Sequence, residues 1–97
     1  MTSREVLERM SEHMPEIRQR FGVRELALFG SAARGESQPD SDVDVLADFD
    51  GAADFDRFMD LKFYLEELLG KRVDLATRKS LRPELSARID GEAIHVA

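Results

Sequence analysis

Apolar side chains recur along the chain with two different periods, and these periods predict helices and strands. Over residues 3–21 they fall three or four positions apart, which places them on one face of a helix: Val6, Leu7, Met10, Met14, Ile17 and Phe21. Ser3 is the expected start of this helix and Gly22 its expected end. Pro15 lies inside the stretch, and an interior proline removes one backbone hydrogen bond. We therefore expect a kink, or two short helices that meet near His13.

The remaining apolar runs are shorter and are separated by glycine, proline and polar clusters that mark turns. The first half of the chain continues with a strand over 23–29, a tight turn into a short helical segment around 32–34, a polar loop over 35–41 and a strand over 42–49. The second half is predicted to contain a helix over 55–69 between Asp54 and Gly70, a strand over 72–77, a helix opened by Ser80 and Pro83 that fades near Gly91, and a short closing strand over 93–96.

This order of elements predicts an α/β (α+β) fold, in which helices cover a small mixed β-sheet of three to four strands. The helix over 55–69 separates two strands and permits a parallel crossover between them. A length of 97 residues suits a single domain spanning 1–97.

The helix predicted over 55–69 carries more large apolar side chains than one buried stripe requires. Met59, Phe63 and Tyr64 make up the excess. Two interpretations stay open for this face: additional contacts with the core, or an interface with another molecule.

Charge and composition exclude several classes of function. The formal net charge is −6, so the chain should repel phosphate backbones, and direct nucleic acid binding is not expected. An acidic chain is better suited to a basic partner protein. There is no cysteine, which excludes disulfides and thiolate metal sites. No apolar run approaches the roughly 20 residues that span a bilayer, and the N-terminus does not resemble a signal peptide, so we expect no membrane association and a cytoplasmic location.

Two acidic residues open the strand predicted over 42–49. Asp42 and Asp44 are two positions apart, so they point to the same face of the strand, while Val43 and Val45 point to the core. Carboxylates this close repel each other, and a divalent cation removes the conflict. Mg²⁺ prefers oxygen ligands and commonly uses one or two carboxylates together with substrate phosphates. The pair is therefore predicted to bind Mg²⁺.

Gly30-Ser31 has the features of a phosphate site. Glycine lets the backbone approach a ligand closely, and the start of a following helix offers unpaired N–H groups to an anion. The hydroxyl of Ser31 adds a donor. A third acid, Asp74, lies in an apolar strand where an isolated carboxylate needs a partner. If its strand neighbours that of Asp42 and Asp44, the three acids can share a metal site.

Other interpretations of this segment fail on specific residues. Asp40, Asp42 and Asp44 imitate the start of a calcium-binding EF-hand loop, but that loop needs glycine where Val45 stands and glutamate where Gly51 stands. No Gly-Lys-Ser or Gly-Lys-Thr is present, which argues against a P-loop. An acid pair on a strand is common by itself, so the metal prediction depends on the glycine-serine pair and on the third acid as well.

Gly30-Ser31, ten further residues and then Asp42-Val43-Asp44 resemble the GS-x10-DxD signature of the DNA polymerase β-like nucleotidyltransferase superfamily. The segments from Leu28 to Gly35 and from Pro39 to Asp44 are similar to its minimal nucleotidyltransferase (MNT) branch. The tail from Val73 to Ile94 resembles MntA-type antitoxins of HEPN/MNT toxin–antitoxin pairs. The resemblance covers essentially the whole chain and implies a nucleotidyltransferase-like fold.

The resemblance also implies a role for each candidate residue. Asp42 and Asp44 would ligate Mg²⁺, and Asp74 would complete the metal site or act as general base toward the incoming hydroxyl. Gly30 and Ser31 would hold the triphosphate of ATP. The implied reaction is transfer of AMP from ATP to a tyrosine of a HEPN-domain toxin, usually a ribonuclease.

Three functions stay open on the sequence. The first is AMP transfer to a protein hydroxyl, and the second is an antitoxin that neutralises its toxin by binding and masking it. The third is nucleotidyl transfer to a small molecule or RNA, for which larger relatives carry an added substrate domain. The acid triad favours an enzyme, because a protein that only binds has no need to crowd carboxylates.

Overall fold

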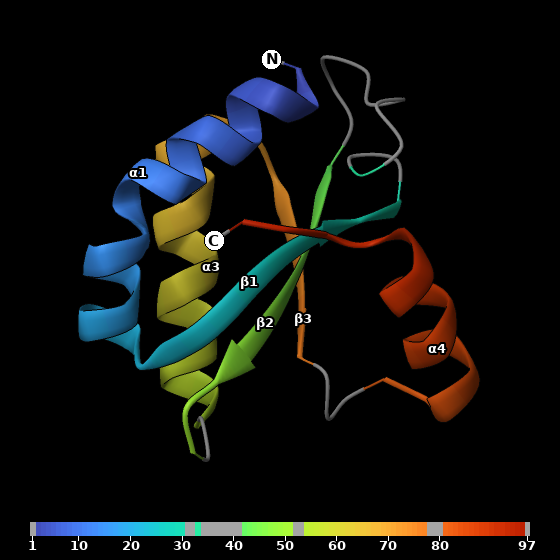
Figure 1. The fold of residues 1–97 in the computed structure, drawn as a ribbon. Helices are drawn as coiled ribbons and strands as arrows, with labels where there is room; N and C mark the ends of the chain where they lie inside the picture. The colour runs from blue at the N-terminus through green and yellow to red at the C-terminus, as the bar shows by residue number, and fades with distance from the viewer. Residues whose placement is uncertain (1, 31–32, 34–41, 52–53, 78–80, 97) are drawn as a thin grey trace.

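A four-stranded mixed β-sheet is the centre of the fold (Figure 1). The structure is a computed structural model and describes residues 2–30, 33, 42–51, 54–77 and 81–96. In chain order the strands are β1 (Val23–Phe29), β2 (Val43–Phe49), β3 (Val73–Thr77) and β4 (Ile94–His95). Their order across the sheet is β3-β2-β1-β4. Strand β1 is antiparallel to both β2 and β4, whereas β2 and β3 are parallel.

Helices cover both faces of this sheet (Figure 1). On one face α1 (Ser3–Phe21) packs beside α3 (Phe55–Leu69), and α4 (Pro83–Glu92) lies on the other face. The predicted α/β class and mixed sheet are therefore confirmed. The crossover through α3 makes β2 and β3 parallel, as its position in the sequence permits. In the part of the chain that the structure describes, no helix is long and apolar enough to cross a membrane.

The alternation of side chains along the strands divides the core into two parts. The larger part lies between the sheet and the α1–α3 layer, and its fully buried members include Met10, Met14, Ile17, Leu26, Leu28, Val43, Val45, Leu61 and Leu65. The smaller part lies beneath α4 and consists of buried Ala27, Leu46 and Ile89. The second face is thus only partly covered by apolar packing, which leaves room for polar residues on the same strands.

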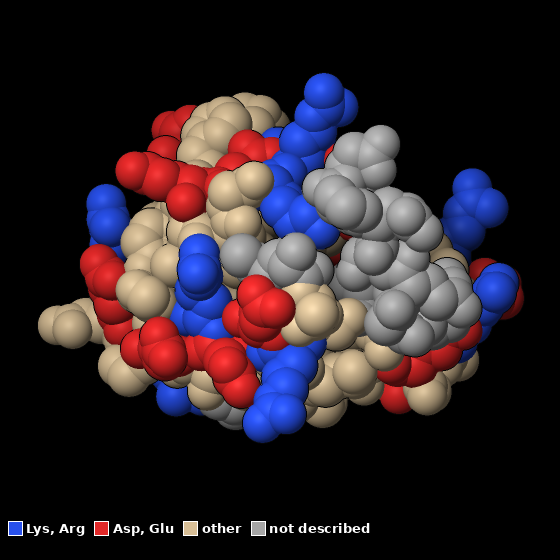
Figure 2. All heavy atoms as spheres, turned by 90° about the horizontal axis from the view of Figure 1, so that it is seen from above, with Lys and Arg blue, Asp and Glu red and all other residues tan. Residues whose placement is uncertain are grey.

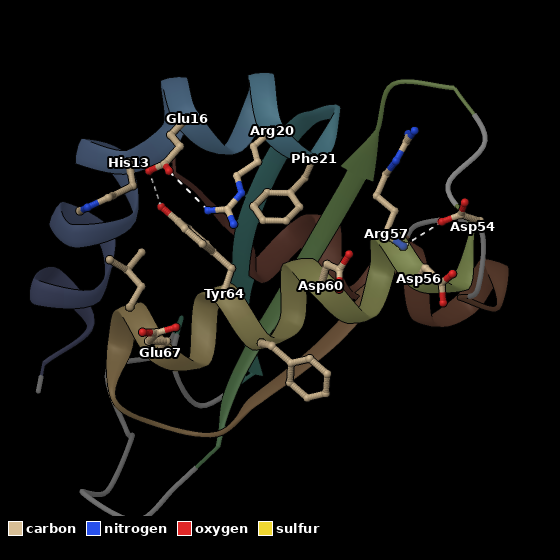
Figure 3. A pocket seen from close by; sticks show the side chains of 12 residues that line it. His13, Glu16, Arg20, Phe21, Asp54, Asp56, Arg57, Asp60, Tyr64 and Glu67 are labelled. Atoms are coloured by element: carbon tan, nitrogen blue, oxygen red, sulfur yellow. Dashed lines mark hydrogen bonds and ion pairs between the residues drawn. The ribbon is translucent and has the colours of Figure 1, made fainter.

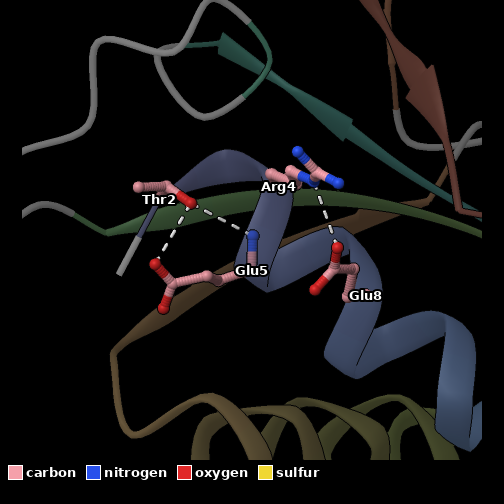
Figure 4. A network of polar contacts seen from close by, with 4 residues as sticks. All are labelled: Thr2, Arg4, Glu5 and Glu8. Carbon is pink, nitrogen blue, oxygen red and sulfur yellow. Dashed lines mark hydrogen bonds and ion pairs between the residues drawn. The ribbon is translucent and has the colours of Figure 1, made fainter.

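Helix α1 spans Ser3–Phe21, as predicted, but its capping residue differs from the expected one. Thr2, not Ser3, is its N-cap, because the Thr2 hydroxyl accepts a hydrogen bond from the Glu5 amide at 3.2 Å. The same hydroxyl donates to the Glu5 carboxylate at 3.3 Å (Figure 4). This reciprocal arrangement needs an acid three residues after the cap, and Ser3 has Val6 at that place. Next to it, Arg4 and Glu8 form an exposed ion pair of 3.1 Å.

Pro15 bends α1 but does not divide it. The helix is continuous from Ser3 to Phe21, and Figure 1 shows its axis changing direction along its length. The expected kink is confirmed, and the alternative of two short helices is wrong. Pro15 and Ser11, whose carbonyl loses its helical partner, are both exposed, so water can satisfy that carbonyl.

The other element ends follow their capping residues. Asp54 accepts from the Arg57 amide at 2.8 Å to start α3, and Gly70 ends it in the left-handed region, both as predicted. Strands β2 and β3 each begin one residue later than expected. Helix α4 begins at Pro83 as predicted, while Ser80 and most of the segment over 31–41 lie outside the described residues.

Candidate active site

Three strand ends meet at the top of the sheet in Figure 1. Strand β1 ends there, and the parallel strands β2 and β3 begin there. The Val43 amide donates to the Arg72 carbonyl at 2.9 Å, which joins the starts of β2 and β3. Helix α4 lies toward the opposite end of this face (Figure 1). The upper end therefore brings together residues from the end of β1 and from the starts of β2 and β3.

Asp44 and Asp74 are direct neighbours across this end of the sheet. They are register partners in the parallel pair of β2 and β3, and neighbouring strands lie about 4.8 Å apart, with paired side chains on one face. Asp44 is half-buried and Asp74 is exposed. The strand of Asp74 is therefore next to that of Asp42 and Asp44, which is the arrangement that a shared site requires.

Asp42 lies one residue before β2 and is exposed. Because side chains alternate along an extended chain, Asp42 and Asp44, which are two positions apart, are expected to point to the same face. Within the described residues no group of three or more His, Asp or Glu side chains is gathered tightly enough to hold a metal ion. The shared metal site of Asp42, Asp44 and Asp74 thus stays a prediction. The donor set fits Mg²⁺ in its chemistry, because carboxylate oxygens are hard ligands.

Gly30 ends β1 directly against the acid pair. Its backbone has a φ of +64°, a region that side chains rarely adopt. A Cβ atom at this position would overlap Asp44 Oδ2 and would lie 3.2 Å from Asp44 Cγ. Glycine is therefore required here by both the backbone and the neighbouring carboxylate. Ser31, the other expected phosphate-binding residue, lies outside the described residues.

Charges of both signs surround this end of the molecule. Seen from above, Lys and Arg side chains are interspersed with Asp and Glu side chains (Figure 2). The described part of this surface thus carries no continuous basic patch of the kind that follows a nucleic acid backbone.

A family comparison decides the class of this site. The family model described as nucleotidyltransferase domain matches residues 10–95. The chain belongs to this family. The nucleotidyltransferase is also 43% identical to the protein adenylyltransferase MntA of Thermococcus cleftensis, over 99% of this chain and 97% of the relative. Both findings confirm the resemblance seen in the sequence, and they make the chain an enzyme of the nucleotidyltransferase class.

Solved structures agree on the fold. One, of a minimal nucleotidyltransferase, is 37% identical and superposes with a TM-score of 0.83 over 97% of this chain and 95% of that chain. A second belongs to the complex of tri-AMPylated Shewanella oneidensis HEPN toxin with MNT antitoxin. It is 16% identical, with a TM-score of 0.68 over 94% of this nucleotidyltransferase and 71% of that chain, and at this identity the likeness concerns the fold alone.

Sequence patterns missed one feature of the molecule. Tyr64 donates a hydrogen bond to Glu16 at 2.8 Å and thereby links α3 to α1 (Figure 3). The two residues are 48 positions apart, and no local period relates residues at that separation. The unassigned apolar excess around Phe63 and Tyr64 was the only signal of it.

Proposed function

We propose that this nucleotidyltransferase is an antitoxin that transfers AMP from Mg-ATP to a hydroxyl, most simply of a tyrosine, on a cognate HEPN-domain ribonuclease in the cytoplasm. The pairing of Asp44 with Asp74 in one register, beside the end of β1, is the observation that carries the proposal. Two carboxylates on adjacent strands repel each other, and a divalent cation would remove that repulsion. The same cation would bind the phosphates held by the proposed phosphate-binding turn beside the two acids.

Each candidate residue has a defined task in this proposal. Asp42 and Asp44 would hold Mg²⁺, which neutralises charge on the triphosphate when bound. Gly30 lets the main chain approach the phosphates, and Ser31 donates to them. The acceptor oxygen attacks the α-phosphorus, the bond from that phosphorus to the bridging oxygen breaks, and pyrophosphate leaves. Positioning and charge stabilisation, more than covalent work by the protein, would then account for the rate.

Asp74 has two possible tasks, and both require its position beside Asp44 on the neighbouring strand. As a third ligand it would share the charge of the metal site. As a general base it would take the proton of the attacking hydroxyl, which requires hydrogen-bond reach of that hydroxyl. Its exposure supports access for an acceptor in either case.

A protein acceptor is supported by the relatives and by charge. The Thermococcus cleftensis relative is a protein adenylyltransferase, and the Shewanella oneidensis complex contains a tri-AMPylated HEPN toxin. A ribonuclease must present basic surface to RNA, and a chain of net charge −6 would be steered toward it. The added phosphate would then repel RNA from the modified toxin.

Label transfer tests this function. The chain is incubated with Mg²⁺, ATP labelled on its α-phosphate and the HEPN-domain protein, and we expect label on the protein. Asp42→Asn and Asp44→Asn should each abolish transfer. Asp48→Asn is the matched control, because Asp48 lies on the same strand and face but beyond Leu46. Equal transfer by all three variants would exclude the proposed metal ligands, and no transfer by the unaltered chain would exclude the function.

A further inference from the structure

A groove of about 910 Å³ runs between α1 and α3, on the side of the helical layer that faces away from the sheet (Figure 3). Three aromatic side chains, Phe21, Phe63 and Tyr64, are among its lining residues. Phe63 is 55% exposed, although it lies in the middle of a helix whose inner face is well packed. The Lys62 ammonium lies over its ring, 5.6 Å from the centroid, and the exposed remainder of Phe63 is apolar surface open to a partner.

The groove is held in shape by contacts across it. Beside the hydrogen bond from Tyr64 to Glu16, the rings of Phe21 and Tyr64 pack with centroids 5.2 Å apart. The Arg20 guanidinium lies over both rings, 5.3 Å and 5.5 Å from their centroids (Figure 3). A binding surface that is already rigid loses less conformational entropy when it is occupied.

The α3 wall presents a regular stripe toward the groove. Asp56, Asp60, Phe63 and Glu67 follow one another at intervals of four, three and four residues, the spacing of one helical face. Along the axis this stripe extends for roughly 17 Å, or three turns. With Asp54 and Glu16, the groove has five carboxylates against two guanidinium groups. It therefore combines aromatic side chains with a surplus of negative charge.

We propose that this groove docks a basic amphipathic helix on the surface of the acceptor protein, a proposal that rests on the proposed function. Such a helix would place an apolar side chain against Phe63 and cationic side chains against the acids of α3. A second copy of this chain fits the groove poorly, because its net charge of −6 would face the same acids.

The groove and the candidate active site lie on different sides of the sheet. The acids of β2 and β3 share the face that α4 partly covers, whereas the groove lies beyond the opposite face. Docking in the groove thus leaves the nucleotide site accessible. Loss of docking should raise the KM for the acceptor and leave kcat and Mg-ATP binding unchanged.

Matched variants test the proposal, with the HEPN-domain protein as probe and calorimetry without nucleotide as readout. Asp60→Lys and Phe63→Ser should each weaken binding by about tenfold or more. Glu84→Lys and Leu85→Ser are their controls, because both residues are exposed on α4, and Leu85 is 45% exposed. The controls should bind like the unaltered chain, and thermal melting should show all four variants folded.

Several outcomes would overturn the docking role. Unchanged binding by the groove variants, or equal losses in groove and control variants, would show that the groove is not the contact. A dimer of this chain in sedimentation that Phe63→Ser dissociates, with acceptor binding intact, would make the groove a self-association surface. If the groove variants transfer AMP with an unchanged KM for the acceptor, docking alone is overturned. If binding depends on the groove but no AMP is transferred, only the proposed chemistry is overturned.

Discussion

At the scale of single residues, the contact between Gly30 and Asp44 explains why position 30 accepts no side chain. The positive φ of Gly30 turns the chain out of β1, and the carboxylate of Asp44 occupies the space where a side chain would stand. A glycine that precedes a helix start is often explained by the ligand it admits. Here the protein's own acid already requires it, and a bound phosphate would add a second reason.

Replacing Gly30 by alanine should therefore damage the site as well as the backbone. The left-handed conformation costs a side chain about 1–2 kcal/mol, and the new Cβ must displace Asp44. We expect lower stability in urea unfolding together with loss of Mg-ATP binding. Gly70→Ala is the matched control, because Gly70 has a φ of +65° and nothing within 4 Å of the added atom. If Gly70→Ala also lost Mg-ATP binding, or Gly30→Ala kept it, the contact with Asp44 would have no role in the site.

Asp74→Asn separates the two tasks proposed for this residue. If Asp74 accepts the proton of the acceptor hydroxyl, the variant should lose AMP transfer far more than Mg-ATP affinity. Equal losses in both would make it a metal ligand. Rates and calorimetric affinities measured on the same samples distinguish the outcomes, and no loss in either would remove Asp74 from the site.

At the scale of elements, local patterns predicted most of the helices and strands and little of their arrangement. The 3.6-residue period and the capping residues placed α1 and α3, because these signals act within one turn. The predicted cap Ser3 was wrong, because a reciprocal contact between Thr2 and Glu5 decides the cap, and β2 and β3 begin one residue later than predicted. Strand order depends on long-range packing, which no local pattern reports. The sequence therefore left open whether Asp44 and Asp74 are neighbours, and the sheet shows that they are.

An element-scale contact also protects the edge of the sheet. Glu66 on α3 accepts a hydrogen bond from the Val73 amide of edge strand β3 at 3.0 Å, and the Lys62 ammonium lies 3.0 Å from the same carboxylate. The hydrogen bond from Val73, and then that from Lys62, lowers the pKa of Glu66. The charged form is thus favoured by folding, and an otherwise open strand amide is occupied.

This contact predicts a pH dependence of stability. A carboxyl whose pKa is lowered by folding stabilises the protein above its unfolded pKa, and that contribution is lost as pH falls through the folded value. Glu66→Gln should lower the melting temperature near pH 7, and its difference from the unaltered chain should shrink in acid below the ordinary glutamate range. Glu67→Gln, at the exposed neighbouring position, is the control. A difference that stays constant with pH would show that the charge of Glu66 is not involved.

At the scale of the whole molecule, the candidate active site and the proposed docking groove lie on opposite sides. The face of the sheet under α4 carries the candidate metal and nucleotide residues, and the opposite helical layer carries the acidic groove. Net charge pointed to a basic partner, but no sequence pattern located the surface that meets it. That surface needs two helices from distant parts of the chain, whereas the segment from Gly30 to Asp44 that carries the candidate motif is short enough for its spacing to be visible in the sequence.

The most direct test of AMP transfer is the intact mass of the HEPN-domain protein after incubation with Mg-ATP and a trace amount of this chain. We predict that the protein gains the mass of one or more AMP groups and loses ribonuclease activity. The chain with Asp42→Asn and Asp44→Asn together should cause neither change. An unchanged mass, with ribonuclease inhibited equally by stoichiometric amounts of both forms, would contradict catalysis and leave neutralisation by masking alone.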